Sequence, residues 1–218
     1  MLIPKLFNSR DEWLEGRGVT IGGSDASSIV GMNPYKTNIE LWEEKTGRKK
    51  PADISDKPYV KYGIEAEALL RELFKLDFPQ YKVMYEENNM FNNPKYPLAH
   101  YSADGWLIDE DGRMGLLEIK TTNILQSQQK EKWNQRIPDN YYIQLLHGLM
   151  VTEASFAILK AQLKSEFNGE IYLQTKHYYI DALDPAIQAD IEYLKHAEMA
   201  FFENLKEDIK PALLLPEI

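Results

Sequence analysis

The sequence predicts a mixed α/β protein in which helices flank a central mixed β-sheet. Two observations support this fold class: apolar residues recur at helical spacing in some segments, and strand-like runs bounded by turn residues lie between them. The expected helices cover 59–76, 139–151 and 184–206, and the expected strands cover 81–85, 99–109, 113–121, 155–163 and 170–180. Helices and strands therefore alternate along the chain, as in a sheet covered by helices.

Length and composition indicate an ordinary globular protein. The 218 residues, 44% of them apolar and 27% charged, suit one domain over 1–218, with a core at about 10–180 and a C-terminal helix at about 184–206. The apolar runs are too short to cross a bilayer, and the N-terminus lacks a basic segment followed by an apolar stretch. We therefore expect a cytoplasmic protein with no membrane partner.

The absence of cysteine restricts the chemistry. It excludes disulfides, thiolate zinc sites, cysteine nucleophiles and cysteine-ligated iron–sulfur clusters. The four histidines are scattered, and no two have helical ligand spacing. A metal in this protein should therefore be a hard cation with oxygen ligands.

The N-terminal third predicts short helices followed by one long helix. Residues 11–16 form a helix, the turn at 22–25 leads into a second helix ending at Gly31, and Thr37 caps a third that runs to Gly47. In the helix at 59–76, an apolar stripe is expected to face the core; its members are Tyr62, Ala66, Leu69, Leu73 and Leu76. Glu67 and Arg71 then lie on the far side, and Glu65 sits at the edge of the stripe, facing inward.

The remaining elements are defined by turns and caps. Asp109–Gly112 joins two strands in a hairpin, and Asn168-Gly169 joins a second pair. The helix at 139–151 is expected to face the core with Tyr142, Leu145, Leu146 and Leu149. Asp184-Pro185 begins the last helix with a cap and a proline, and its stripe is Ile187, Ile191, Leu194, Phe201 and Leu205.

The chemistry is concentrated in two segments, Ser102-Ala-Asp-Gly105 and Leu117-Glu-Ile-Lys120. Alternate residues of a strand share a face, so Glu118 and Lys120 point the same way while Ile119 points into the core. Hairpin pairing brings Asp104 beside them. Two carboxylates and an ammonium group are therefore expected at one edge of the sheet.

This grouping suits metal-assisted phosphodiester cleavage. Asp104 and Glu118, with the backbone carbonyl of Ile119, would hold Mg²⁺ (or Mn²⁺ in its place), and Glu65 would reach inward as another ligand. Lys120 would orient the attacking water or stabilise charge on the phosphate. The spacing taken alone also fits a surface ion pair.

Five segments, in order, resemble a known family. Arg17–Gly31 with Asn33-Pro-Tyr35 is similar to the opening of the YqaJ-type viral recombinases, relatives of lambda exonuclease in the PD-(D/E)xK nuclease superfamily. The further matches are Tyr62-Gly-Ile-Glu65, Ser102–Trp106, Leu117–Lys120 and a glutamine-bearing helix from Tyr142 to Thr152. The resemblance covers about residues 10–155 and implies a restriction-endonuclease-like nuclease core.

The resemblance also implies roles for individual residues. The metal ligands would be Asp104 and Glu118, with Lys120 as the catalytic lysine and Glu65 as a further active-site acid. Gln144 would lie near the metal or the attacking water, and Arg17 and Ser24 would hold a DNA 5′-phosphate. Helix N-termini and close backbone approach at glycines are compatible with the phosphate role. Gly22-Gly23 is a departure, because some relatives carry alanine before the serine.

The function implied is a Mg²⁺-dependent exodeoxyribonuclease that degrades one strand of linear duplex DNA 5′→3′ and leaves 3′ overhangs for phage-type recombination. The same resemblance implies a ring-shaped homotrimer and a single-strand annealing protein as partner. A structure-specific endonuclease and a non-catalytic DNA-end-binding module stay as alternatives. The net charge of −9 argues against a general nucleic-acid coat, but a nuclease needs basic residues along only one groove.

Aromatic and basic residues outside the motifs have simpler readings. Trp42, Trp106 and Trp133 are expected to pack inside the protein rather than stack on DNA. The polar segment Gln126–Arg136, which carries Lys130 and Lys132, fits either a path for a DNA strand or an exposed loop.

Overall fold

The computed structural model describes residues 3–18, 20–134 and 136–215. Val19 of the Arg17–Gly31 stretch and Gln135 of the polar segment lie outside the described residues, as do the ends of the expected 1–218 domain. The elements, in chain order, are β1 (Lys5–Leu6), α1 (Arg10–Arg17), α2 (Gly23–Ile29), α3 (Asn38–Lys45), α4 (Pro58–Asp77), β2 (Lys82–Met84), β3 (Asn89–Asn92), β4 (His100–Tyr101), β5 (Gly105–Ile108), β6 (Met114–Ile124), α5 (Ser127–Glu131), α6 (Asp139–Thr152), β7 (Phe156–Phe167), β8 (Glu170–Asp181) and α7 (Pro185–Lys206).

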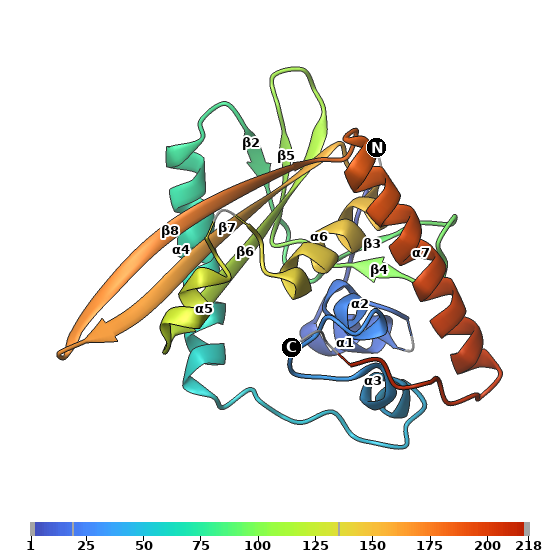
Figure 1. The fold of residues 1–218 in the computed structure, drawn as a ribbon. Helices are drawn as coiled ribbons and strands as arrows, with labels where there is room; N and C mark the ends of the chain where they lie inside the picture. The colour runs from blue at the N-terminus through green and yellow to red at the C-terminus, as the bar shows by residue number, and fades with distance from the viewer. Residues whose placement is uncertain (1–2, 19, 135, 216–218) are drawn as a thin grey trace.

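The central sheet has five strands in the order β2-β5-β6-β7-β8. Strands β6 and β7 run parallel, with Glu118 opposite Leu159, and the other neighbours run antiparallel. The long β7–β8 hairpin sweeps away from the body of the molecule, with its turn at one extremity (Figure 1). The predicted class, a mixed α/β fold with a central mixed sheet, is confirmed.

Helices cover both faces of this sheet. Successive strand residues point to opposite faces, so Leu116 and Leu117 of β6 belong to different cores. Leu116 packs in the cluster that includes Leu145 and Leu149 of α6, whereas Leu117 packs with Leu70 of α4. Helix α4 therefore lies on one face and α6 on the other, and β6 runs between them.

The crossover from β6 to β7 places the start of α6 beside the end of β6. Helix α6 lies close to the sheet because Gly148 has no side chain: a Cβ there would come within 2.9 Å of Leu116 and of Tyr101. Helices α2 and α7 pack on the outer side of α6, through a cluster that contains Ala26, Leu146 and Leu194. The N-terminus of α2 is thereby carried close to β6, the middle strand of the sheet, and Ser24 of α2 lines the same cavity as Lys120 of β6.

The expected orientation of α4 is wrong. Leu70 is 2% exposed and Phe74 is fully buried, whereas Leu69, predicted to face the core, is 68% exposed. Two stripes on this helix have helical spacing, and they share Ala66. The predicted stripe runs through positions 62, 66, 69, 73 and 76, and the buried stripe runs through positions 66, 70 and 74. The structure has the second orientation, which carries Arg71 inward, where Arg71 is buried in an ion pair with Glu67.

The expected strand at 99–109 is two strands in two sheets. Strand β4 pairs with β3 in a small sheet of order β1-β3-β4, and β5 belongs to the central sheet. The break falls at residues 102–104, just before the second sheet begins. Strands β1 and β3 were not expected, because they are short and lack alternation.

Tryptophans 42, 106 and 133 are buried, as predicted. Among the described residues, no helix combines the length and apolar composition that crossing a membrane requires.

Candidate active site

Glu118 lies in the middle of β6 and its side chain is 1% exposed. Its carboxylate accepts hydrogen bonds from the hydroxyl of Tyr101, from Lys120 Nζ at 2.5 Å and from Gln144 Nε2 at 2.6 Å. The donors come from β4, β6 and α6. The structure thus brings together Glu118, Lys120 and Gln144, which the sequence placed in one site, and adds Tyr101.

Asp104 immediately precedes β5, and its backbone is fixed from two sides. The amide side chain of Asn89 in β3 accepts from Ala103 N at 2.8 Å and donates to Ala103 O at 2.9 Å. Arg71 Nε donates to the carbonyl of Asp104 at 2.5 Å. The carboxylate then turns toward β6, where Asp104 Oδ2 accepts from Ile119 N at 2.8 Å.

Glu67, rather than Glu65, is the α4 acid that reaches the site. Glu67 is half-buried, lines the same cavity as Asp104 and Lys120, and accepts from Arg71 Nη2 at 2.5 Å. Glu65 is exposed and is not among the residues that line this cavity. The expectation that Glu65 faces inward is wrong because the orientation of α4 about its axis differs from the expected one. Positions 67, 70, 71 and 74 face the sheet, and position 65 faces away from it.

Burial and neighbouring charges shift the pKa of Asp104, Glu67 and Lys120. Burial and the negative charge of Glu118 hold the pKa of Asp104 well above its usual range, against the opposing charge of Lys120. Burial likewise raises the pKa of Glu67, although Arg71 counteracts it. Burial lowers the pKa of Lys120, but Glu118 and Asp104 outweigh that effect and raise it above its ordinary value. The lysine therefore stays charged beside crowded acids.

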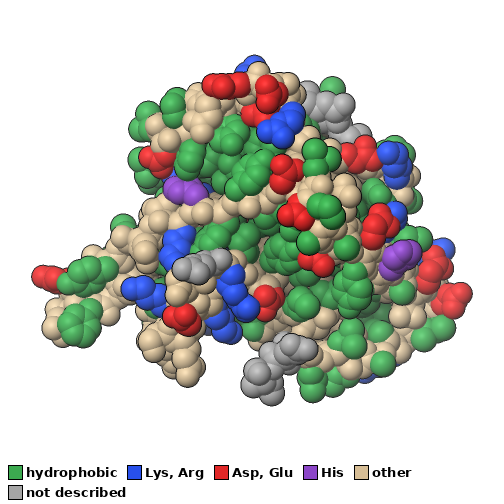
Figure 2. Space-filling model, turned by 45° about the horizontal axis from the view of Figure 1, so that its top comes forward, with side chains coloured by type: hydrophobic (Ala, Val, Ile, Leu, Met, Phe, Trp, Pro, Cys, Tyr) green, Lys and Arg blue, Asp and Glu red, His purple; other side chains and the backbone are tan. Residues whose placement is uncertain are grey.

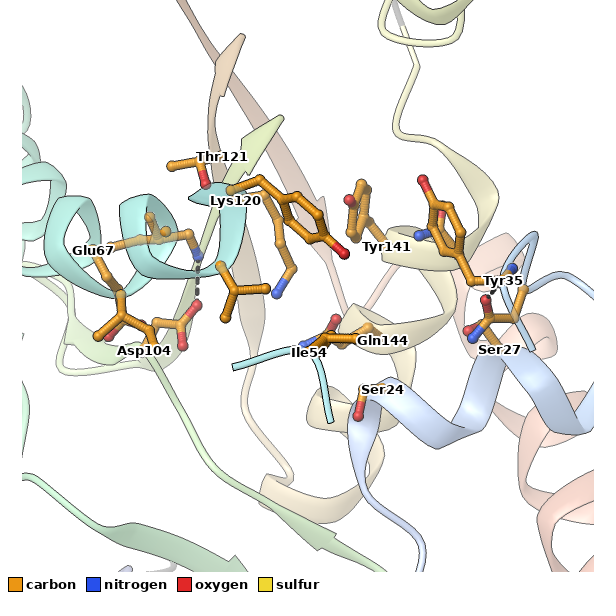
Figure 3. A pocket seen from close by; sticks show the side chains of 17 residues that line it. Ser24, Ser27, Tyr35, Ile54, Glu67, Asp104, Lys120, Thr121, Tyr141 and Gln144 are labelled. Atoms are coloured by element: carbon orange, nitrogen blue, oxygen red, sulfur yellow. Dashed lines mark hydrogen bonds between the residues drawn. The ribbon is translucent and has the colours of Figure 1, made fainter. Parts of the chain in front are cut away.

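Glu67, Asp104 and Lys120 open onto a cavity of about 480 Å³. Figure 3 shows Glu67 and Asp104 on one side, Lys120 in the middle and Tyr141 and Tyr35 on the other side. The β-strand face provides the floor, while the first turns of α4 and α6 provide the walls. A volume of this size is typical of sites that hold one small ligand or one building block of a polymer.

Arg17 and Ser24 meet at a second, smaller cavity of about 190 Å³, which also touches Asp104 and Gln144. The guanidinium of Arg17 lies over the Trp13 ring, 4.7 Å from its centroid. A Cβ at Gly22 would lie 2.9 Å from His100 Nε2 and 3.4 Å from Arg17 Nη2. The glycine that departs from some relatives therefore leaves room for these side chains.

The donor chemistry of the acidic cluster fits a hard divalent cation. Asp104, Glu118 and Glu67 are carboxylates that interact unfavourably with one another, and the positive charges of Lys120 and Arg71 offset part of this repulsion. In the described residues no three His, Cys, Asp or Glu side chains form a ready-made metal cluster. The carboxylate of Glu118 is instead held by its three hydrogen-bond donors. Oxygen ligands of this kind suit Mg²⁺ or Mn²⁺.

Sequence reasoning missed the supporting residues. Asn89, Tyr101 and Arg71 hold the site residues in place but match no motif. The spacing of Glu67 and Arg71 was the available signal, since an i, i+4 ion pair can be inside a protein as well as on its surface. Asn89 had no such signal, because its partner Ala103 is brought close only by the β3–β4 pairing.

Known proteins match both the sequence and the fold. The family model described as "YqaJ-like viral recombinase domain" matches residues 12–155. A relative described as uncharacterized protein YqaJ, from Bacillus subtilis (strain 168), is 34% identical over 156 residues, which are 69% of this chain. The match covers 46% of that relative, so the chain spans about half of its length.

Similar solved structures show the fold. The alkaline exonuclease LHK-Exo from Laribacter hongkongensis superposes with a TM-score of 0.62 at 16% identity, over 91% of this chain and 94% of that chain. The complex of LHK-Exo with dAMP superposes with a TM-score of 0.60 at 16% identity, over the same shares. Because the family model covers more than half of the sequence, the chain belongs to the YqaJ-like viral recombinase domain family.

Proposed function

We propose that this protein is a metal-dependent exodeoxyribonuclease that hydrolyses phosphodiester bonds of one strand of linear duplex DNA. The observation that carries the proposal is that Asp104, Glu67 and Lys120 line one cavity, with the buried Glu118 directly behind them in contact with Lys120. Carboxylates with an adjacent lysine suit phosphoryl transfer, where the main demand is stabilisation of negative charge. The family and the shared fold with an alkaline exonuclease, solved also with dAMP, support a nucleotide-releasing activity.

Asp104 and Glu118, together with Glu67 and the backbone carbonyl of Ile119, would hold Mg²⁺, with Mn²⁺ as a substitute. Bound there, the cation would polarise the phosphate and make water a better nucleophile. Lys120 is close enough to share this charge stabilisation, and it neutralises part of the acidic cluster before the cation binds. Gln144 orients the Glu118 carboxylate through its 2.6 Å hydrogen bond.

The direction of digestion rests on the smaller cavity. Arg17 and Ser24 line it together, and it touches Asp104. A 5′-phosphate bound by a guanidinium and a hydroxyl would place the first phosphodiester bond next to the carboxylates. We therefore favour 5′→3′ digestion that leaves 3′ overhangs for phage-type recombination.

DNA binding needs a basic surface, although the molecule has a net charge of −9. Figure 2 shows Lys and Arg side chains gathered at the base of the projecting hairpin. Lys130 of α5 lines a hollow together with hairpin residues, and Lys176 of β8 donates to the Trp133 carbonyl at 2.6 Å. Of the two readings of 126–136, a path for a DNA strand and an exposed loop, this basic group supports the DNA path.

Assembly and setting follow from the family resemblance. A ring-shaped homotrimer would enclose the DNA, and a single-strand annealing protein would take over the 3′ overhang. Both steps would take place in the cytoplasm of a bacterial or phage-infected cell.

The test uses linear duplexes labelled separately at each end, closed circular DNA, Mg²⁺ and a Glu118→Gln control. Loss of nucleotides from 5′ ends of linear DNA alone, abolished in the control, supports the proposal. Cutting of circles would replace it with an endonuclease. A folded protein that binds ends and cuts neither substrate in Mg²⁺ or Mn²⁺ would be a DNA-end-binding module.

A further inference from the structure

Three tyrosines from three different elements surround the mouth of the acidic cavity. Tyr35 lies in the loop between α2 and α3, Tyr59 in the first turn of α4 and Tyr141 in the first turn of α6. All three line the cavity that contains Glu67, Asp104 and Lys120. Nothing in the metal or lysine chemistry described above requires aromatic rings at this position.

Tyr35 is 85% exposed, yet its backbone is held firmly. Its amide donates to Asn33 Oδ1 at 2.9 Å, and Asn33 Nδ2 donates to Ser28 Oγ at 3.0 Å. Pro34, between them, restricts the backbone further. The loop thus presents a large ring to solvent from a fixed position, and the ring's faces stay available for a ligand.

The other two rings are also anchored. Tyr141 packs against the buried Trp133, with 5.4 Å between ring centroids, and Lys120 Nζ lies 5.8 Å from the Tyr141 centroid. Tyr59 is 54% exposed and follows Pro58, which begins α4. Figure 3 shows Tyr141 and Tyr35 side by side on the side of the cavity away from Glu67 and Asp104. An aromatic wall therefore faces an acidic wall, with Lys120 between them.

We propose that Tyr35, Tyr59 and Tyr141 form a stacking site for the unpaired base of the 5′-terminal nucleotide, whose 3′ phosphodiester bond is the one cleaved at the acidic centre. The inference rests on the proposed nuclease function and adds the part of the substrate that the site recognises. A nucleotide has a charged end for Lys120 and the carboxylates and a flat end for aromatic rings. The cavity of about 480 Å³ suits one such unit, so the terminal base must leave its pair to enter.

Stacking explains why an enzyme of this kind would tolerate any sequence. Every base has a π-face, and stacking on an aromatic side chain requires no particular pattern of hydrogen bonds. The alternative role for exposed tyrosines is hydrogen bonding of their hydroxyls to the DNA backbone. The two roles separate cleanly, because phenylalanine keeps the ring and loses the hydroxyl.

The test compares two linear duplexes that differ only in the 5′-terminal nucleotide, one normal and one abasic. Release of that nucleotide is measured as kcat/KM for the wild type, Tyr35→Ala, Tyr35→Phe and Tyr193→Ala, an exposed tyrosine of α7 away from the cavity. We expect the abasic end to lower wild-type kcat/KM by roughly 5- to 100-fold. On the normal end, kcat/KM of Tyr35→Ala should fall below that of the wild type by a similar factor. On the abasic end, kcat/KM of Tyr35→Ala should be close to that of the wild type. Tyr35→Phe and Tyr193→Ala should match the wild type on both ends.

The stacking site would be overturned, with the nuclease proposal left intact, by either of two results. One is that Tyr35→Ala lowers kcat/KM equally on the normal and the abasic end. The other is that Tyr35→Phe lowers kcat/KM on the normal end as much as Tyr35→Ala does. Binding gives an independent reading without added metal. A 2-aminopurine at the 5′ terminus should lose fluorescence when it stacks in the wild-type protein and keep it with Tyr35→Ala. Quenching that is identical in both proteins contradicts the inference even if no cleavage occurs, whereas absence of cleavage alone counts against the proposed function.

Discussion

The Glu118 carboxylate is held by residues from three separate elements, and this arrangement explains how a buried acid keeps a fixed orientation. Tyr101, Lys120 and Gln144 each donate to it, so both oxygens have partners. A buried carboxylate without such donors would be costly, because it loses its hydration. Its precise placement therefore depends on the packing of α6 against β4 and β6.

Glu67 should contribute to activity and Glu65 should not. Glu67→Gln keeps the size of the side chain but removes a charge next to Asp104 and Glu118, and we expect kcat to fall by roughly 10²-fold or more. Glu65→Gln changes an exposed neighbour on the same helix and should leave kcat within about twofold of the wild type. Steady-state digestion of linear duplex DNA measures both. A strong effect of Glu65→Gln with none from Glu67→Gln would show that α4 is oriented otherwise.

His100 should make stability depend on pH. Burial and the nearby charge of Arg17 lower the pKa of His100 to about 3, from about 6.5 in an unfolded chain. Between these two pKa values His100 is protonated in the unfolded chain and neutral in the folded protein. Protonation therefore favours the unfolded chain, and the free energy of unfolding, which His100 does not lower above about pH 6.5, decreases as the pH falls toward 3. Urea unfolding should show the wild type losing up to ~1.4 kcal/mol per pH unit relative to His100→Gln between pH 6 and 4.5. Parallel curves would contradict this.

The sequence allowed Asp104, Glu118 and Lys120 to be grouped, because the period of two in a strand and a hairpin turn determine which residues are adjacent. It did not predict Tyr101 or Asn89 as supporting residues. Their partners lie on other strands, and the break between β4 and β5 that creates these contacts leaves no periodic signal. Local rules therefore located the chemistry, while tertiary pairing supplied what holds it.

At the scale of elements, α4 shows why the existence of a helix is easier to predict than its orientation. Its ends, Pro58 and Asp77, match the expected 59–76 closely. Leucines lie on both sides of the helix, so the apolar pattern permits two orientations. The buried ion pair of Glu67 with Arg71, which stacks on Tyr85, decides between them through contacts with the sheet.

Two leucines of α4 test that orientation directly. Leu70→Ala removes a buried side chain from the core against β6 and should lower the free energy of unfolding by about 2–5 kcal/mol. Leu73→Ala alters a side chain that is 48% exposed and should change it by less than about 0.5 kcal/mol. Denaturant unfolding of the two variants gives the comparison, and a reversed order of their effects would be incompatible with the structure.

For the whole molecule, separation of charge reconciles the net negative charge with the proposed DNA binding. The acids Glu67 and Asp104 line a cavity, and a basic group lies at the base of the β7–β8 hairpin (Figure 2). Overall charge is a poor guide here because only the surface facing the phosphates matters for binding.

Salt dependence should locate that surface. Duplex affinity should fall as salt rises, and Lys130→Gln should reduce the slope of log affinity against log salt concentration by about one, as expected when one phosphate contact is lost. Lys206→Gln, an exposed lysine of α7, is the matched control and should leave the slope unchanged. Fluorescence anisotropy with a labelled duplex measures all three proteins. Equal slopes for Lys130→Gln and the wild type would place the DNA elsewhere.

We propose that Asp104, Glu118, Glu67 and Lys120 form a metal-dependent nuclease centre. Nucleotide release from linear duplex DNA by EDTA-treated protein, measured during titration with Mg²⁺ beside folded Glu118→Gln, tests this proposal. We expect no release without the cation, saturable release with it and at least roughly 10²-fold less release from the variant at every concentration. Release that persists in EDTA, or that Glu118→Gln matches, would show that these residues do not form such a centre.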